Sequence, residues 1–178
     1  PIHIALSYDE EVGCIGVRGL LSTMESMTVL PEMAIIGEPT NMDIVVAHKG
    51  KRAIRVVVNG ASSHSAYPTA GVNAIDFASR LVAHIGTLQK QIASEGPFDA
   101  GYQVPYSTLH VGTIKGGTAL NIVPNRCSFD FEIRHLPGHD GDLLIDLIRE
   151  HAENKLEPEM RTKNSDTGIE FEELFGYP

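Results

Sequence analysis

The order of apolar and polar positions predicts three elements in the first forty residues. Residues 2–7, IHIALS, are a nearly continuous apolar run, which is typical of a buried strand. Residues 13–24 carry apolar side chains at helical spacing, and residues 33–37, MAIIG, form a second apolar run. The pattern therefore predicts a parallel β-α-β unit with a right-handed crossover, whose functional groups collect at the carboxyl ends of its strands.

The pattern changes near residue 45 and predicts a second domain. Residues 126–134, RCSFDFEIR, alternate cleanly between apolar and polar side chains, which predicts a sheet with one face exposed. In chain order, the predicted elements are a strand at 52–58, a helix at 73–92, strands at 108–114 and 126–134, a helix that follows Asp140, and a strand at 169–175. This β-α-β-β-α-β order is the split βαβ plan, so we expect an α+β, ferredoxin-like, two-layer domain with an antiparallel sheet.

Composition narrows the possible partners and the compartment. The chain has a net charge of −9 and no run of Lys and Arg, which argues against binding to nucleic acid or anionic lipid. No apolar run approaches the roughly 20 residues of a membrane span, and the N-terminus lacks the pattern of a targeting segment. Two cysteines make a disulfide framework unexpected, so we expect a cytoplasmic protein. The abrupt ends of the chain read as those of an excised internal segment.

Three carboxylates follow the two predicted strands of the first unit. Glu10 and Glu11 come after the first strand, and Glu38 comes after the second. Neighbouring side chains on an extended backbone point in different directions, so one glutamate can bind a metal ion while the other transfers protons. Acidic residues at a strand end are also a common solvated turn, and each position alone is weak evidence. Together they predict a cation site along one edge of the sheet.

Three polar residues of the second domain are candidates for substrate contact. His64 lies in the turn-rich segment SSHSAYP rather than on an apolar face, although a plain surface histidine fits that position too. Asn121 lies in GGTALNIVP, where it can offer its amide to a substrate or cap the turn itself. Arg134 ends a strand on its polar face, where it can clamp a carboxylate or pair with Glu132 or Asp130.

Several motifs, in their order and spacing, resemble one enzyme family. SYDEE, AIIGEPT, AHKG, SSHSAYPTAGVNAI and GGTALNIVPNRCSFDFEIRHLPG look like the middle of proteins of the acetylornithine deacetylase and succinyl-diaminopimelate desuccinylase family. The resemblance spans nearly the whole chain and favours the acetylornithine deacetylase branch. It implies a catalytic domain with a dinuclear metal site and an inserted α+β lid. Residues 1–44 would be part of the catalytic domain, 45–175 the lid and dimerisation domain, and 176–178 the return to the catalytic domain.

The resemblance also implies roles for single residues. Glu10 would be the general base, with Glu11 and Glu38 ligands of two divalent metals, zinc or cobalt, and Asp9 a support residue. His64 would reach into the partner subunit of a homodimer and donate to the oxyanion of the tetrahedral intermediate. Asn121 and Arg134 would hold the carboxylate end of a small N-acyl amino acid substrate.

Some ligands expected from the resemblance do not occur in the chain. Family members need a His-x-Asp ligand pair and a further ligand histidine, and the sequence contains no His-x-Asp. We therefore expect this segment alone to bind zinc weakly and to be inactive, while the parent enzyme hydrolyses N2-acetyl-L-ornithine to L-ornithine and acetate in arginine biosynthesis. The alternatives are another N-acyl amino acid, a succinylated diamine or a dipeptide as substrate, or a non-catalytic dimerisation module.

Overall fold

The chain folds as two units, Pro1–Ala47 and His48–Pro178. The structure is a computed structural model that describes residues 2–11 and 13–178. Across these described residues, no helix is both long and apolar enough to cross a membrane.

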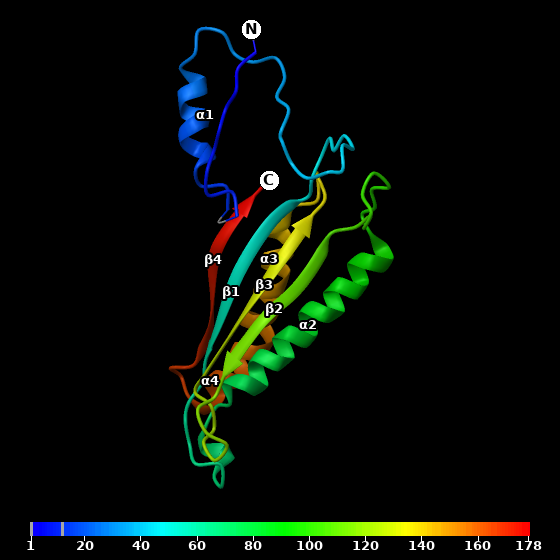
Figure 1. Ribbon diagram of the computed structural model, residues 1–178. Helices are drawn as coiled ribbons and strands as arrows, with labels where there is room; N and C mark the ends of the chain where they lie inside the picture. The colour runs from blue at the N-terminus through cyan, green and yellow to red at the C-terminus, as the bar shows by residue number, and fades with distance from the viewer. Residues whose placement is uncertain (1, 12) are drawn as a thin grey trace. The chain divides into compact units, whose positions relative to one another are not determined.

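Among the described residues of the first unit there is one helix, α1, Val17–Glu25 (Figure 1). The predicted strands at 2–7 and 33–37 are not formed in the described part of this unit, so the parallel β-α-β prediction for residues 1–44 is corrected to a helix flanked by irregular segments. Ile2 and Ile35 are 97% and 88% exposed. An apolar run becomes a buried strand only where a neighbouring strand pairs with its backbone and another layer covers its side chains. Neither run has these partners here.

The second unit is built on a four-stranded sheet. Its strands are β1, Gly50–Asn59, β2, Thr108–Gly116, β3, Arg126–His135, and β4, Gly168–Tyr177. They lie in the order β2-β3-β1-β4, and every neighbouring pair is antiparallel. The antiparallel, ferredoxin-like sheet predicted from the sequence is therefore confirmed. β4 continues through residues 176 and 177, which pair with β1.

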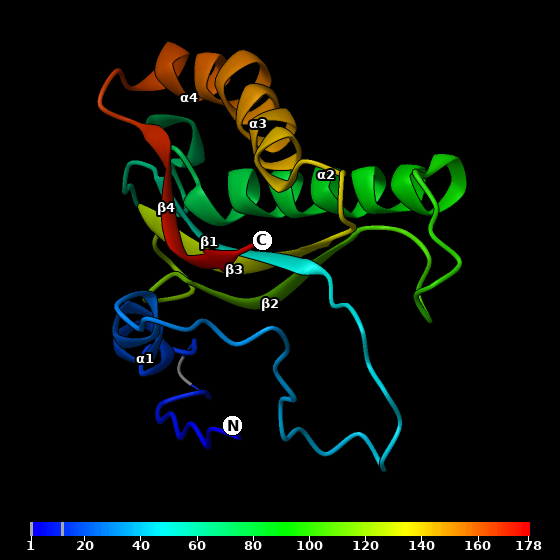
Figure 2. The same cartoon turned by 90° about the horizontal axis from the view of Figure 1, so that it is seen from above.

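The helices of this unit lie on one face of its sheet, and none of them covers the opposite face, here called the helix-free face (Figure 2). The long helix α2, Ala74–Glu95, begins where the Asn73 side chain accepts hydrogen bonds from the backbone N–H groups of Ile75 and Asp76. The second helix, α3, Gly141–His151, continues through a π-helical turn, Ala152–Leu156, into α4, Glu157–Lys163. A short 3-10 turn, Pro68–Ala70, precedes α2.

The strict alternation of side chains decides which strand residues enter the core. On β3, Phe129, Phe131 and Ile133 are at most 2% exposed and pack under the helices. The residues between them, including Glu132 and Arg134, therefore lie on the helix-free face of the sheet. The register pairs Lys51 of β1 with Arg134, which puts Lys51 on the same face.

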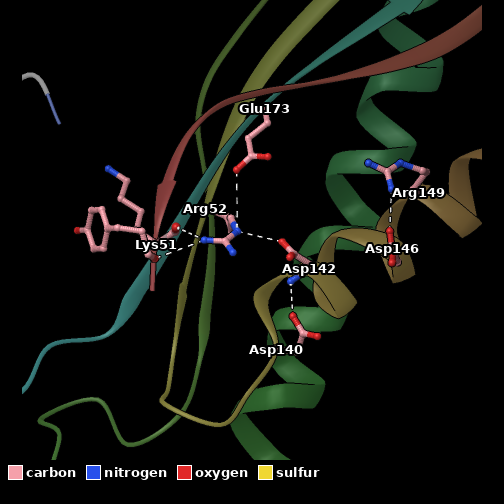
Figure 3. A network of polar contacts seen from close by, with 8 residues as sticks. Lys51, Arg52, Asp140, Asp142, Asp146, Arg149 and Glu173 are labelled. Atoms are coloured by element: carbon pink, nitrogen blue, oxygen red, sulfur yellow. Dashed lines mark hydrogen bonds and ion pairs between the residues drawn. The ribbon is translucent and has the colours of Figure 1, made fainter. Parts of the chain in front are cut away.

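Arg52 points to the opposite side of β1 from Lys51 and ties three elements together (Figure 3). Its Nε lies 2.9 Å from Oδ1 of Asp142 at the start of α3 and 3.9 Å from Oε1 of Glu173 on β4. The hydrogen bond between Arg52 and Asp142 raises the pKa of the guanidinium and lowers the pKa of the carboxyl group. This contact therefore fixes the start of α3 over the sheet.

Candidate active-site elements

Two loops meet at the end of the sheet where β1 ends and β3 begins, here called the tip. One loop, residues 60–73, follows β1, and the other, residues 117–125, precedes β3. The backbone N–H of Ser65 donates to Asn121 O at 2.9 Å, and that of Val123 donates to Ser63 O at 2.8 Å. His64 and Ile122 form a single β-bridge between them. The fold thus brings His64 and Asn121 into neighbouring backbone positions.

The His64 side chain is exposed and free to meet another molecule. Its Nδ1 accepts a hydrogen bond from the backbone N–H of Ala66 at 3.1 Å. An imidazole whose Nδ1 accepts this bond carries its proton on Nε2, so a donor group faces outward. The Tyr67 ring lies edge-on to the His64 ring, with centroids 6.5 Å apart. Asn121 is exposed as well.

A groove of about 670 Å³ runs along the tip beside these loops. Its walls come from residues 65–75 and 116–124, and they include Ile75 at the start of α2. Leu120 stands fully exposed on the second loop. The groove is mostly apolar, with Ser65, Asn73 and Thr118 as its polar side chains.

Arg134 lies at the other end of the sheet, here called the base, where β1 begins and β4 ends. Its Nε donates to Glu132 Oε1 at 3.1 Å, and its Nη1 donates to the Tyr177 hydroxyl at 2.9 Å. Burial alone lowers the pKa of Arg134, but the hydrogen bond and charge of Glu132 outweigh it and hold the pKa above its ordinary value. Of the pairings considered for Arg134 from the sequence, the one with Glu132 is formed.

The structure does not bring Asn121 and Arg134 together. Asn121 belongs to the tip, and Arg134 is eight residues along β3 from Arg126, which is about 26 Å at roughly 3.3 Å per residue. A substrate of amino-acid size spans much less than this length. One chain therefore cannot use His64, Asn121 and Arg134 on the same small molecule.

The three predicted metal-site carboxylates lie in the first unit and are all exposed. Glu10 O accepts hydrogen bonds from the backbone N–H groups of Gly13 and Cys14 in a tight turn, where Asp9 has a φ of 54°. Glu38 sits in another turn, with its backbone carbonyl accepting from Thr40 N at 2.8 Å.

No metal site forms from these carboxylates in the structure. Within residues 2–11 and 13–178, no three His, Cys, Asp or Glu side chains are grouped so that they can hold a metal ion. A zinc site takes about four ligands, so the residues present do not by themselves fit a dinuclear centre.

Sequence reasoning identified Glu132 as a partner of Arg134 but missed two other neighbours. Tyr177 and Lys51 flank it, and both are set by the register of β1 with β3 and β4. A strand pattern reveals which residues share a face, but the register fixes which residues are neighbours, and no turn links these strands directly. Only Glu132, two positions before Arg134, could be identified as a partner from the sequence.

Comparison with known proteins identifies the family of the sheet unit. Residues 46–160 match the family model described as the peptidase dimerisation domain, of M20 type. The chain belongs to the peptidase dimerisation domain family. The matched range includes β1, α2, β2, β3 and α3, together with both tip loops.

Relatives of this peptidase dimerisation domain protein extend the match to the first unit. Acetylornithine deacetylase of Myxococcus xanthus is 35% identical over 175 residues, covering 95% of this chain and 45% of the relative. Acetylornithine deacetylase of Aliivibrio salmonicida is 34% identical over 150 residues, covering 84% of this chain and 39% of the relative. The chain thus spans less than half the length of these curated relatives.

A solved structure shares the fold of this peptidase dimerisation domain protein. It is a putative aminohydrolase from methicillin-resistant Staphylococcus aureus, with a TM-score of 0.59 and 18% identity, covering 73% of this chain and 31% of the other. At this identity, the solved structure shows a likeness of fold alone.

Proposed function

We propose that this chain is part of an amidohydrolase that cleaves N2-acetyl-L-ornithine to L-ornithine and acetate. The observation that carries the proposal is the extent of the match to a protein named acetylornithine deacetylase, which covers 95% of the chain. That match includes the carboxylate-bearing first unit as well as the dimerisation domain. A relative used only for dimerisation would not need the SYDEE and GEP segments.

In this proposal Glu10 handles protons. A carboxylate takes a proton from the attacking water and returns one to the leaving amine, which is general base and general acid catalysis. Glu10 is exposed, so water reaches it directly. Glu11 and Glu38 would be ligands of two divalent metals in the full-length protein, zinc or cobalt, which would need further ligands from outside this chain.

In this proposal, His64 and Arg134 of one chain act on two different substrate molecules. The length of β3 keeps the tip and the base of one chain apart, so a substrate that meets both must lie between two chains. His64 offers a donor for the oxyanion of the tetrahedral intermediate, and removing one such donor typically costs about 10²–10³ in rate. Arg134 offers a charged fork for a carboxylate. This arrangement favours a homodimer in which His64 at the tip of each chain contacts the substrate bound by the partner.

Edge strand β2 is the best-suited surface for that dimer. The sheet has two edges, β2 and β4. β4 carries Glu170, Glu172 and Glu173, so pairing it with its own copy would set like charges opposite each other. β2 carries the exposed Ile114 and no acidic residue. An unpaired edge without acidic side chains is a template for strand addition.

The test is turnover by the full-length protein supplied with zinc or cobalt. We expect N2-acetyl-L-ornithine to be hydrolysed with a higher kcat/KM than N-succinyl-diaminopimelate or dipeptides. Glu10→Gln should abolish turnover, whereas Asp43→Asn, another exposed carboxyl group of the first unit, should leave it unchanged. A preference for another amide would replace the substrate, and no turnover of any amide would remove the hydrolase proposal.

A second candidate function is a dimerisation module without catalysis. It is favoured by the lack of a grouped metal-ligand set among the described residues. A full-length protein that forms dimers but hydrolyses none of these amides would support it.

A further inference from the structure

On its helix-free face, the base of the sheet carries a cluster of two cations and one carboxylate. Lys51 Nζ lies 3.0 Å from Glu132 Oε2, and Arg134 Nε lies 3.1 Å from Glu132 Oε1. One carboxylate thus faces two cations, which leaves a surplus of one positive charge on a protein whose net charge is −9. All three side chains lie on the helix-free face and are between 15% and 39% exposed.

A second ion pair on the same face provides a comparison, because its arginine is fully paired with one carboxylate. Arg55 donates from Nε and Nη2 to the two oxygens of Asp130 at 2.8 and 3.0 Å. That fork is closed by one carboxylate, and its charge is cancelled. An arginine in this state has little left for a ligand.

Arg134 is held differently. Its Nη2 lies 3.5 Å from Glu132 Oε2, at the outer limit of a hydrogen bond, and Lys51 Nζ lies 3.0 Å from the same oxygen. Its Nη1 is fixed by the Tyr177 hydroxyl, a neutral acceptor. The Tyr177 ring in turn lies edge-on to His48, with centroids 5.6 Å apart. The guanidinium is therefore oriented without being neutralised.

Lys51 is itself well placed. Its ammonium lies 4.4 Å from the centre of the Phe175 ring, and it points away from Arg52 and the helices (Figure 3). A cation over an aromatic face is held without consuming negative charge.

We propose that Lys51 and Tyr177 are positioning residues that keep the Arg134 guanidinium oriented and keep a net positive charge around it for an anionic group of the substrate. The inference rests on the proposed function, in which Arg134 binds the carboxylate of an N-acyl amino acid. Lys51 shares the Glu132 carboxylate with Arg134, and Tyr177 sets the direction of the Arg134 guanidinium. Without Lys51, Glu132 would pair with Arg134 alone, and the pair would have no net charge. The Glu132 carboxylate would then also repel the substrate carboxylate.

The experiment compares Lys51→Met, Lys51→Arg and Tyr177→Phe in the full-length protein, with N2-acetyl-L-ornithine and with its carboxamide, which lacks the negative charge. Lys163→Met, at the exposed end of α4, is the matched control for loss of one lysine charge. We expect Lys51→Met to raise KM for the carboxylate substrate about tenfold, as for loss of a charged contact, with kcat unchanged. KM for the carboxamide should not change, and Lys51→Arg should restore KM. Tyr177→Phe should raise KM for the carboxylate substrate by a smaller factor.

The outcomes separate the inference from the function on which it rests. An inactive wild-type protein would remove the proposed function itself. An active wild-type protein with Lys51→Met indistinguishable from Lys163→Met would remove only the role of Lys51. Equal increases in KM for both substrates, or failure of Lys51→Arg to restore KM, would mark Lys51 as structural and overturn the proposal. An unchanged KM in Tyr177→Phe would remove Tyr177 from it.

Discussion

The imidazole rings of His84 and His151 stack face to face, with their centroids 3.7 Å apart and their planes 8° apart. His84 lies in the middle of α2, and His151 is the last residue of α3, so the stack joins the two helices that cover the sheet. Burial lowers the pKa of His84, and the neighbouring His151 lowers it further. Burial, Arg80 and Lys155 lower the pKa of His151. The stacked pair is therefore neutral at pH 7.

This stack predicts a loss of stability in mild acid. The pKa of each histidine is lower in the folded chain than the ordinary value of 6.5, so the unfolded chain binds protons first as the pH falls. The stabilising contribution is complete above pH 6.5, and it declines below that pH toward the depressed folded pKa. The free energy of unfolding, measured with urea at pH 7.5 and 5.5, should fall more in the wild type than in His84→Gln or His151→Gln.

The matched control for this pH effect is His110→Gln, because His110 is exposed on β2. That variant should keep the wild-type pH dependence. Arg80, whose charge lowers the pKa of His151, is itself paired with Glu159 at 2.7 Å. A wild-type stability that is flat between the two pH values would contradict the prediction.

The sequence predicted the sheet unit well because its signals are local and strong. The alternation of Phe129 and Phe131 with charged residues identified the core face of β3, and the helical spacing of apolar residues over 73–92 located α2. The continuation beyond His151 was not predicted, because Pro158 lies near the start of α4 and suggests an end to any helix. In the first unit, residues 2–7 and 33–37 were predicted as strands because an apolar run does not reveal whether a neighbouring strand is present to pair with it.

The candidate site was predicted residue by residue, but its arrangement was not. His64 and Asn121 were identified separately, and their contact depends on the pairing of two loops about sixty positions apart. Arg134 was grouped with Asn121 by resemblance, yet the strand length sets them at opposite ends of the sheet. Distances of this kind follow from topology and register, which no single stretch of sequence encodes.

A second prediction concerns Glu157, which is 7% exposed and joins α4 to β4. Its Oε1 accepts a hydrogen bond from the backbone N–H of Ile169 at 2.8 Å, and its Oε2 pairs with Arg161 at 2.8 Å. Glu157→Ala leaves that N–H without its partner and should cost about 1–3 kcal/mol in the free energy of unfolding. Glu157→Gln retains an acceptor and should cost less. Equal losses in the two variants, measured by urea unfolding, would contradict the assigned role of the hydrogen bond.

A third prediction concerns metal binding by the 178-residue chain itself. Glu11 and Glu38 are exposed, and no His-x-Asp pair accompanies them in the sequence. We expect zinc affinity far below the roughly 10–16 kcal/mol of structural zinc sites, and no hydrolysis of N2-acetyl-L-ornithine. Competition with a chromogenic chelator measures the affinity, and Glu11→Gln with Glu38→Gln should leave it nearly unchanged. Tight binding of two zinc ions per chain would contradict this expectation.

The last prediction tests which edge of the sheet forms the dimer. Ile114 on β2 is 52% exposed, and Leu174 on β4 is 40% exposed, so they form a matched pair on opposite edges. Placing a lysine in a strand pair between two copies sets like charges near each other and removes apolar contact. Ile114→Lys should therefore shift the full-length protein from dimer to monomer in sedimentation velocity, while Leu174→Lys should remain dimeric. If Leu174→Lys alone produced monomers, β4 would be the interface instead of β2. In that case, residues of the partner would have to neutralise the glutamates of β4.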